Sequence, residues 1–512
     1  MGNLFKIILG AAFAFAAAYY ANTLAGNVPN SGFLMMATLF GAYMAMNIGA
    51  NDVANNVGPA VGAGALTIGG AIIIASIFEA GGALIAGGDV VGTIKKGIIS
   101  PTAFGNDPMI FVYAMSAALL AAALWLNLAT WLKAPVSTTH SIVGGVMGAG
   151  IAAGGFAIVS WGTMGKIAAS WVISPVLGGA IAAGFLYIIK TKIINQTDKI
   201  EAAKKVVPIL VAIMSAAFIT YLTLKGLKHI WKDLTTAISF LPHTKKPTIG
   251  VGLSAGVLGG IVTYFIVKPR VVAKVANLKN TRADLNKLFT IPLIFAAALL
   301  SFAHGANDVA NAVGPLAAVN DAIVNATISK KAAIPLWVMA VGGIGISIGL
   351  ALFGPRLIKT VGSEITELDQ MRAFSIMMAA AITVIIASQL GLPVSSTHIA
   401  VGAVFGVGFL REWLDSKNAG EAQKKLEAEQ DKLKAIKTAL KNCTNDDAAK
   451  KLELISQEKA QKKVVKKLKK ALRENYVKRG MVKKIVAAWV ITVPAAAVVS
   501  AIIFFVIKGV GA

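Results

Sequence analysis

The feature that most constrains this chain is an apolar run of about 20 residues, enough for an α-helix to cross a bilayer, which recurs along most of the sequence. Such runs begin near Leu4, Gly32, Leu66, Met109, Pro135, Gly165, Val206, Thr248, Leu288, Ile334, Arg372, Pro393 and Ile485. They are continuous rather than alternating, which excludes a membrane β-barrel. The sequence therefore predicts an all-α polytopic membrane protein with about 12 transmembrane helices, some of them broken or re-entrant.

Composition supports this class. The 512 residues are 56% apolar and 14% charged, whereas soluble domains carry roughly a quarter charged residues. The net charge of +25 could indicate nucleic-acid binding, but the basic residues lie in short loops and in one long segment, residues 411–484. We interpret them as the positive bias of cytoplasmic loops, in contact with anionic lipid and not with nucleic acid. The single cysteine, Cys443, excludes an internal disulfide.

The chain contains an internal duplication. Residues 49–59, Gly-Ala-Asn-Asp-Val-Ala-Asn-Asn-Val-Gly-Pro, return at 305–315 with one difference. Residues 135–140, Pro-Val-Ser-Thr-Thr-His, return as Pro-Val-Ser-Ser-Thr-His at 393–398. Two motifs that recur in the same order at nearly the same spacing indicate two homologous halves.

The basic loops predict how the halves are oriented. If residues 190–205, 268–287 and 411–484 are cytoplasmic, the first motif enters the membrane from outside and the second from inside. We therefore expect two inverted-topology repeats with a site between them, an arrangement typical of alternating-access transporters. The predicted units are a first repeat at 1–160, linking helices at 161–287, a second repeat at 288–415, a cytoplasmic basic helical hairpin at 416–480, and a C-terminal transmembrane helix at 481–512.

The first motif suggests a cation site. An ionised Asp inside an apolar helix costs roughly 2.5–3.5 kcal/mol, so its presence needs a reason. Carboxylate and amide oxygens suit a small hard cation, and the neighbouring Gly and Pro predict local unwinding that would free backbone carbonyls. A structural pairing of the carboxylates is the alternative. The candidate cation-binding residues are Asn51, Asp52, Asn55, Asn307, Asp308 and Asn311.

The second motif suggests an anion site. A Pro followed by hydroxyl residues predicts a helix start, and a helix N-terminus attracts anions. Simple helix capping is the alternative. The candidate phosphate-binding residues are Ser137, Thr138, Thr139, Ser395, Ser396 and Thr397. His140 and His398 follow directly, and either a proton or coupling role or plain packing fits them.

The two motifs resemble those of the inorganic phosphate transporter family, which includes low-affinity phosphate permeases and sodium–phosphate symporters. The resemblance covers residues 30–160 and 288–412. It implies a secondary active transporter that carries inorganic phosphate by cation symport, with sodium favoured, and no enzyme activity. Sodium-coupled relatives carry an intramembrane Glu in each repeat, for which this chain offers Glu79 and, at the position we align in the second repeat, Met377.

Several alternatives stay open at this stage. One is a proton-coupled carrier of metal–phosphate complexes or of another tetrahedral oxyanion such as sulfate. A channel is another, and a Ser-His-Asp hydrolase is disfavoured because every candidate group occurs twice. No cofactor is expected beyond the co-transported sodium or proton. We expect an integral protein of the bacterial inner membrane, and a homodimer is the candidate assembly.

Overall fold

The computed structural model describes residues 2–100, 104, 107–132, 136–228, 230–239, 241–325, 334–364, 368–417, 421–443, 448–474 and 479–511. Within these ranges the chain is almost wholly helical, and its one β-bridge joins Ile99 to Val159. Eleven helical segments of the described part are long and apolar enough to cross a membrane, close to the number expected. The prediction of an all-α polytopic membrane protein is confirmed.

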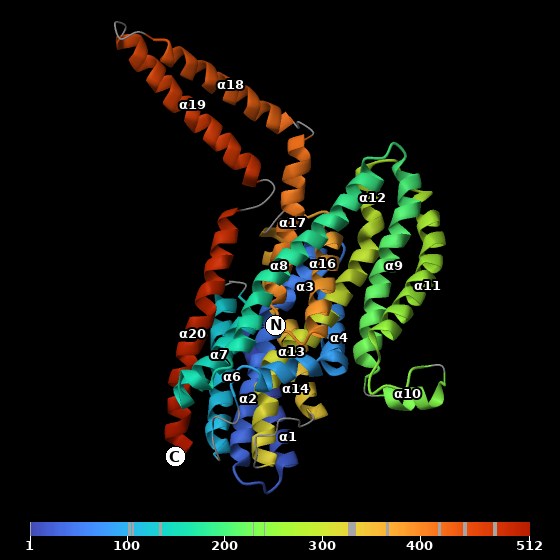
Figure 1. Ribbon diagram of the computed structural model, residues 1–512, viewed down its shortest axis with the longest axis vertical. Helices are drawn as coiled ribbons and strands as arrows, with labels where there is room; N and C mark the ends of the chain where they lie inside the picture. The colour runs from blue at the N-terminus through green and yellow to red at the C-terminus, as the bar shows by residue number, and fades with distance from the viewer. Residues whose placement is uncertain are drawn as a thin grey trace.

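In chain order the helices are grouped below into a first half and a second half, each with one copy of the repeated motifs, and the part that connects them (Figure 1). The first half comprises α1 (Asn3–Ala25), α2 (Ser31–Asn51), α3 (Val53–Gly62), α4 (Ile68–Ala86), α5 (Gly88–Lys96), α6 (Pro108–Trp131), α7 (Thr138–Gly154), η2 (Phe156–Ile158), α8 (Trp161–Ile189) and η3 (Lys190–Ile194). The connecting part comprises α9 (Lys199–Gly226), α10 (Trp231–Ala237), α11 (Ile249–Val275), α12 (Arg282–Asn286) and η4 (Lys287–Phe289). The second half comprises α13 (Thr290–Val324), α14 (Leu336–Phe353), α15 (Pro355–Glu364), α16 (Gln370–Gln389), α17 (Ser396–Lys417), α18 (Glu421–Lys441), α19 (Ala448–Glu474) and α20 (Arg479–Gly511).

Side-chain caps fix where several core helices begin. The carboxylate of Asp107 accepts a bond of 2.9 Å from the Met109 amide, and Pro108 occupies the first helical position of α6. The carboxylate of Asp369 caps α16 in the same way, accepting from the Arg372 amide at 2.9 Å. These caps satisfy amides that would otherwise lack partners at the helix ends.

Glycines bring the core helices into backbone contact, and the contacts are matched between the halves. A Cβ on Gly49 would lie 1.9 Å from the Ile346 carbonyl oxygen, and one on Gly305 would lie 2.2 Å from the Glu79 carbonyl oxygen. Helix α2 thus packs on α14 as α13 packs on α4. The match makes Ile346 the counterpart of Glu79 in the internal duplication. Met377, the position aligned with the second Glu of the sodium-coupled relatives, lies on α16 instead.

The structure does not show the local unwinding that was expected around the first motif. Helix α13 runs unbroken from Thr290 to Val324, through both Gly305 and Pro315. In the first half, α2 and α3 are separated only by Asp52, whose backbone is itself right-handed helical. The glycines therefore serve close packing, and the backbone carbonyls stay within the helices.

The helices that carry the hydroxyl motifs are each covered by a helix from the other half. A Cβ on Gly144 of α7 would lie 2.5 Å from the carbonyl oxygen of Val493 on α20. A Cβ on Gly402 of α17 would lie 2.2 Å from the carbonyl oxygen of Pro175 on α8. Helices α8 and α20 are thus exchanged between the halves.

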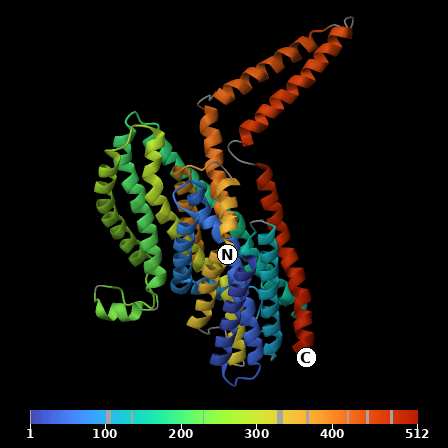
Figure 2. The same cartoon turned by 180° about the vertical axis from the view of Figure 1, so that it is seen from behind.

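The basic loops gather at one end of the molecule. The Lys199 amide donates to the Asn280 side-chain oxygen at 3.0 Å, and Arg282 pairs with Asp369 at 2.7 Å. Helices α18 and α19 pack against each other and extend beyond the bundle from this end, whereas α10 lies at the far end of α9 and α11 (Figures 1 and 2).

Candidate functional site

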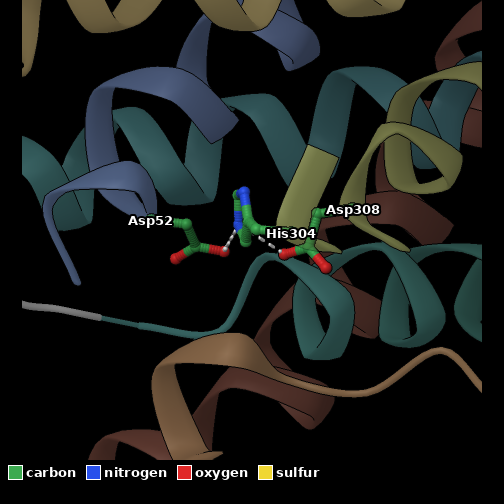
Figure 3. A group of neighbouring side chains, drawn as sticks. All are labelled: Asp52, His304 and Asp308. Atoms are coloured by element: carbon green, nitrogen blue, oxygen red, sulfur yellow. Dashed lines mark ion pairs between the residues drawn. The ribbon is translucent and has the colours of Figure 1, made fainter. Parts of the chain in front are cut away.

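The two repeated aspartates meet at the centre of the bundle, on either side of a histidine (Figure 3). Asp52 lies between α2 and α3, and Asp308 and His304 lie one turn apart on α13. The His304 Nε2 atom is 3.0 Å from the Asp308 Oδ2 atom and 4.0 Å from the Asp52 Oδ2 atom. All three side chains are buried, so bulk water does not screen their charges.

Hydroxyls from both copies of the second motif donate hydrogen bonds to these carboxylates. Thr138 of α7 donates to the Asp52 Oδ2 atom at 2.6 Å and lies 3.3 Å from the Asp308 Oδ2 atom. From the other half, Thr397 of α17 donates to the Asp52 Oδ1 atom at 3.0 Å. Ser396 makes a longer contact of 3.5 Å with Asp308. The N-termini of α7 and α17 therefore converge on one pair of carboxylates.

The asparagines of the first motif tie the halves together. Asn55 donates to the Thr397 hydroxyl at 2.9 Å, across the two halves. Asn311 donates to the Thr138 and Thr139 hydroxyls, each at 3.2 Å, in the opposite direction. The sequence-predicted cation and anion residues thus form one interlocked cluster.

Two of the predicted cation residues, Asn51 and Asn307, hydrogen-bond to neighbouring helices. Asn51 donates to the Thr130 hydroxyl on α6 at 2.9 Å, and Asn307 donates to the Ser388 hydroxyl on α16 at 2.9 Å. Asn307 also accepts a bond of 3.3 Å from the Val394 amide, just before the second hydroxyl motif. These side chains hold neighbouring segments in place beside the aspartates.

Ser137 and Ser395 act as helix caps in this structure. The Ser137 hydroxyl accepts from the His140 amide at 3.1 Å, and the Ser395 hydroxyl accepts from the His398 amide at 3.2 Å. The preceding Pro135 lies outside the described residues. Capping orients the first turn of each helix, so the capping and anion-site interpretations are compatible.

The cluster contains oxygen atoms ready for a cation. Within the described part of the chain, Asp308 Oδ1 and Asn311 Oδ1 are buried without a hydrogen-bond partner. One ligand atom from each of Asp52, His304 and Asp308 lies within 4.8 Å of the other two. Buried acceptors without donors are costly, and a positive ion would satisfy them.

The sequence motifs did not single out His304 as a site residue. Its Nδ1 atom is 2.7 Å from the Glu79 Oε2 atom, and Asn56 donates to Glu79 Oε1 at 2.8 Å. Glu79, a predicted coupling residue, thus reaches Asp308 through His304. The available signal was the i, i+4 spacing between His304 and Asp308, with Ile48 standing at the corresponding place in the first copy.

The motif histidines lie apart from the aspartates in a ring stack. The centroids of His140 and His398 are 4.4 Å apart, and the outer faces of the two rings meet Trp171 at 3.6 Å and Trp489 at 3.5 Å. The Nδ1 atom of His140 is 2.6 Å from the Ser137 hydroxyl. This geometry fits the packing interpretation, and a coupling role for either histidine stays a prediction.

Comparisons with known proteins agree with this architecture. A sequence profile of the phosphate transporter family matches residues 48–500. A protein of Helicobacter pylori strain J99, whose name contains the words phosphate permease, is 48% identical over 518 residues, covering 98% of this chain and 94% of its own. A similarly named protein of Pyrococcus abyssi is 40% identical over 382 residues, covering 74% of this chain and 89% of its own.

A solved structure titled "The sodium-dependent phosphate transporter" is 32% identical, with a TM-score of 0.74, and covers 93% of this chain and 99% of its own. The matched family consists of transporters rather than enzymes, so the hydrolase alternative falls away. The resemblance predicted from the two motifs is confirmed. The chain is an integral membrane protein that belongs to the phosphate transporter family.

Proposed function

We propose that this protein is a secondary active transporter of the bacterial plasma membrane that carries inorganic phosphate together with a cation. The observation that carries the proposal is the interlocked cluster, in which hydroxyls at two helix N-termini bond directly to two buried carboxylates. Family membership supports phosphate as the cargo.

The anion would bind where the N-termini of α7 and α17 converge. The buried amides and hydroxyls there favour a tetrahedral oxyanion, and neither hydroxyl motif contains Lys or Arg. A phosphate group would meet the negative charges of Asp52 and Asp308 unless cations were bound first. The affinity for phosphate therefore depends on the bound cation, which is the physical basis of symport.

The cation would bind at Asp52, Asp308 and the free amide oxygen of Asn311. Hard oxygen ligands suit sodium, and the sodium-dependent name of the solved relative supports that choice. The second candidate is a proton-coupled carrier of metal–phosphate complexes. The imidazole of His304 favours it, because nitrogen ligands suit divalent transition metals.

Alternating access would require halves of opposite orientation. The matched contacts of Gly49 and Gly305 support a two-fold relation between the halves. Single cysteines near Asn27 and near Lys287, on a Cys443→Ser background, should label from opposite sides of the membrane. Labelling of both by an impermeant reagent added outside would reject the inversion.

Uptake of radiolabelled phosphate into proteoliposomes tests the proposal directly. An imposed sodium gradient should drive accumulation, and a proton gradient alone should not. Calorimetric titrations should show that the cation raises phosphate affinity by the same factor as phosphate raises cation affinity, because linkage is reciprocal. Saturable binding without gradient-driven uptake would reject symport, and competition by sulfate at equal concentration would reject phosphate specificity.

A further inference from the structure

A second cavity opens on the side of the bundle away from the hairpin, beside α10. It has a volume of about 690 Å³ and lies between α5, the end of α9, the segment after α10 and the end of α16. We name it the basic vestibule. Four lysines line it, Lys225, Lys228, Lys245 and Lys246, against one carboxylate, that of Asp89.

The charges in the basic vestibule do not cancel. Asp89 pairs with Lys225, which is buried, and with Lys228 at 2.7 Å. Burial opposes ionisation of Asp89, but the bonds and charges of these two lysines outweigh it and hold its pKa below the usual range. No carboxylate of the described residues pairs with Lys245 or Lys246. The cavity therefore keeps a net positive charge at neutral pH.

The floor of the vestibule offers an unused donor. The Nε2 atom of Gln389, the last residue of α16, is buried and has no hydrogen-bond partner in the described part of the chain. An anion held between this amide and the lysine ammonium groups would satisfy it.

The lining of the basic vestibule is also connected by hydrogen bonds to the interlocked cluster of the candidate site. Gly391 adopts a φ of 66°, a left-handed conformation, and its carbonyl accepts from the Thr93 hydroxyl at 2.7 Å. The next carbonyl, that of Leu392, accepts from Asn307 at 3.2 Å. Ser395 caps α17 only three residues later. An anion in the vestibule would thus lie one short segment away from the second hydroxyl motif.

Another cavity, of about 680 Å³, lies in the other half and is lined mainly by α1, α2 and α6. Its wall includes Thr130, which accepts from Asn51, and Arg356, which lies as far beyond Ile346 as Asp89 lies beyond Glu79.

We propose that the basic vestibule is a second anion-binding site, which takes a phosphate-type oxyanion outside the transport cluster. Only a role of this site in supplying phosphate to the cluster rests on the proposed function; anion binding in the vestibule does not. The same chemistry fits free phosphate and the phosphate of a lipid headgroup.

The test is equilibrium binding of radiolabelled phosphate to the full chain in phosphatidylcholine nanodiscs without sodium, where the cation-dependent transport site is weak. The Lys245→Gln/Lys246→Gln variant should raise the dissociation constant of this cation-independent site by about fivefold or more, because two unpaired charges are lost. Lys232→Gln is the matched control, since this exposed α10 residue lies outside the cavity.

A second arm adds phosphatidylglycerol to the nanodiscs. Displacement of free phosphate, together with lysine-dependent retention of the lipid in native mass spectrometry, would identify a headgroup phosphate as the occupant. Free phosphate that persists would identify the solute. Absence of both, or an equal loss with Lys232→Gln, would overturn the proposal. Failure of gradient-driven uptake with intact vestibule binding would count against the proposed function alone.

Discussion

Asp308→Asn is expected to lower the binding affinity for the coupling cation by about two orders of magnitude. The ligand atoms of Asp52, His304 and Asp308 lie within 4.8 Å of one another. An ion at the centre of this triangle would therefore lie no more than about 2.8 Å from each of them. At an effective dielectric of about 20, a unit charge at that distance contributes about 6 kcal/mol. The amide dipole of Asn keeps part of this attraction and the site relaxes, so we take half, about 3 kcal/mol or about a hundredfold in affinity.

The assay is the cation dependence of phosphate uptake in proteoliposomes, followed by intrinsic-fluorescence titration of the purified variant. The apparent dissociation constant for the cation should rise about a hundredfold while the protein keeps its elution profile. Asp284→Asn is the matched control, because this half-buried carboxylate lies on α12 away from the cluster, and it should change neither quantity. A shift below tenfold in a folded Asp308→Asn protein would refute the electrostatic reasoning.

Three further results are expected. Lys95→Met should lower the free energy of unfolding by about 3–5 kcal/mol, because it leaves the buried carboxylate of Asp321 without its positive partner. Adding Asp321→Leu should restore most of the lost melting temperature, measured by fluorescence-detected size-exclusion chromatography after heating. Additive losses from the two substitutions would contradict this. Gly305→Ala should abolish a stable elution peak, since its Cβ would lie 2.2 Å from a backbone oxygen of α4, whereas Gly32→Ala meets nothing and should behave as wild type. Deletion of residues 418–474 with a short linker should retain uptake, and a folded but inactive deletion would show that the hairpin supports transport.

Much of the site could be predicted from the sequence because duplication repeats what function needs. Asp52 and Asp308 stood out as charges in apolar runs, and the structure brings them together with Thr138 and Thr397. Their roles in binding remain predictions. Periodicity and run length were enough for the fold class, since bilayer thickness sets helix length.

What the sequence did not give is where the halves differ. His304 of the second half and Glu79 of the first form a polar pair across the two halves, whereas their counterparts Ile48 and Ile346 are apolar. A search for repeated motifs overlooks such positions. The expected unwinding near Gly305 failed for a different reason, because local sequence cannot show that a glycine is needed for contact with a distant helix.

The exchange of α8 and α20 has a consequence for biosynthesis. Helix α7 carries Thr138 into the site, yet the backbone that packs against its Gly144 belongs to Val493, more than three hundred residues later in the chain. Almost the whole chain must therefore be synthesised before Gly144 of α7 can pack against α20. A chain that stops before α20 would leave the Gly144 and Gly148 face of α7 without its partner helix.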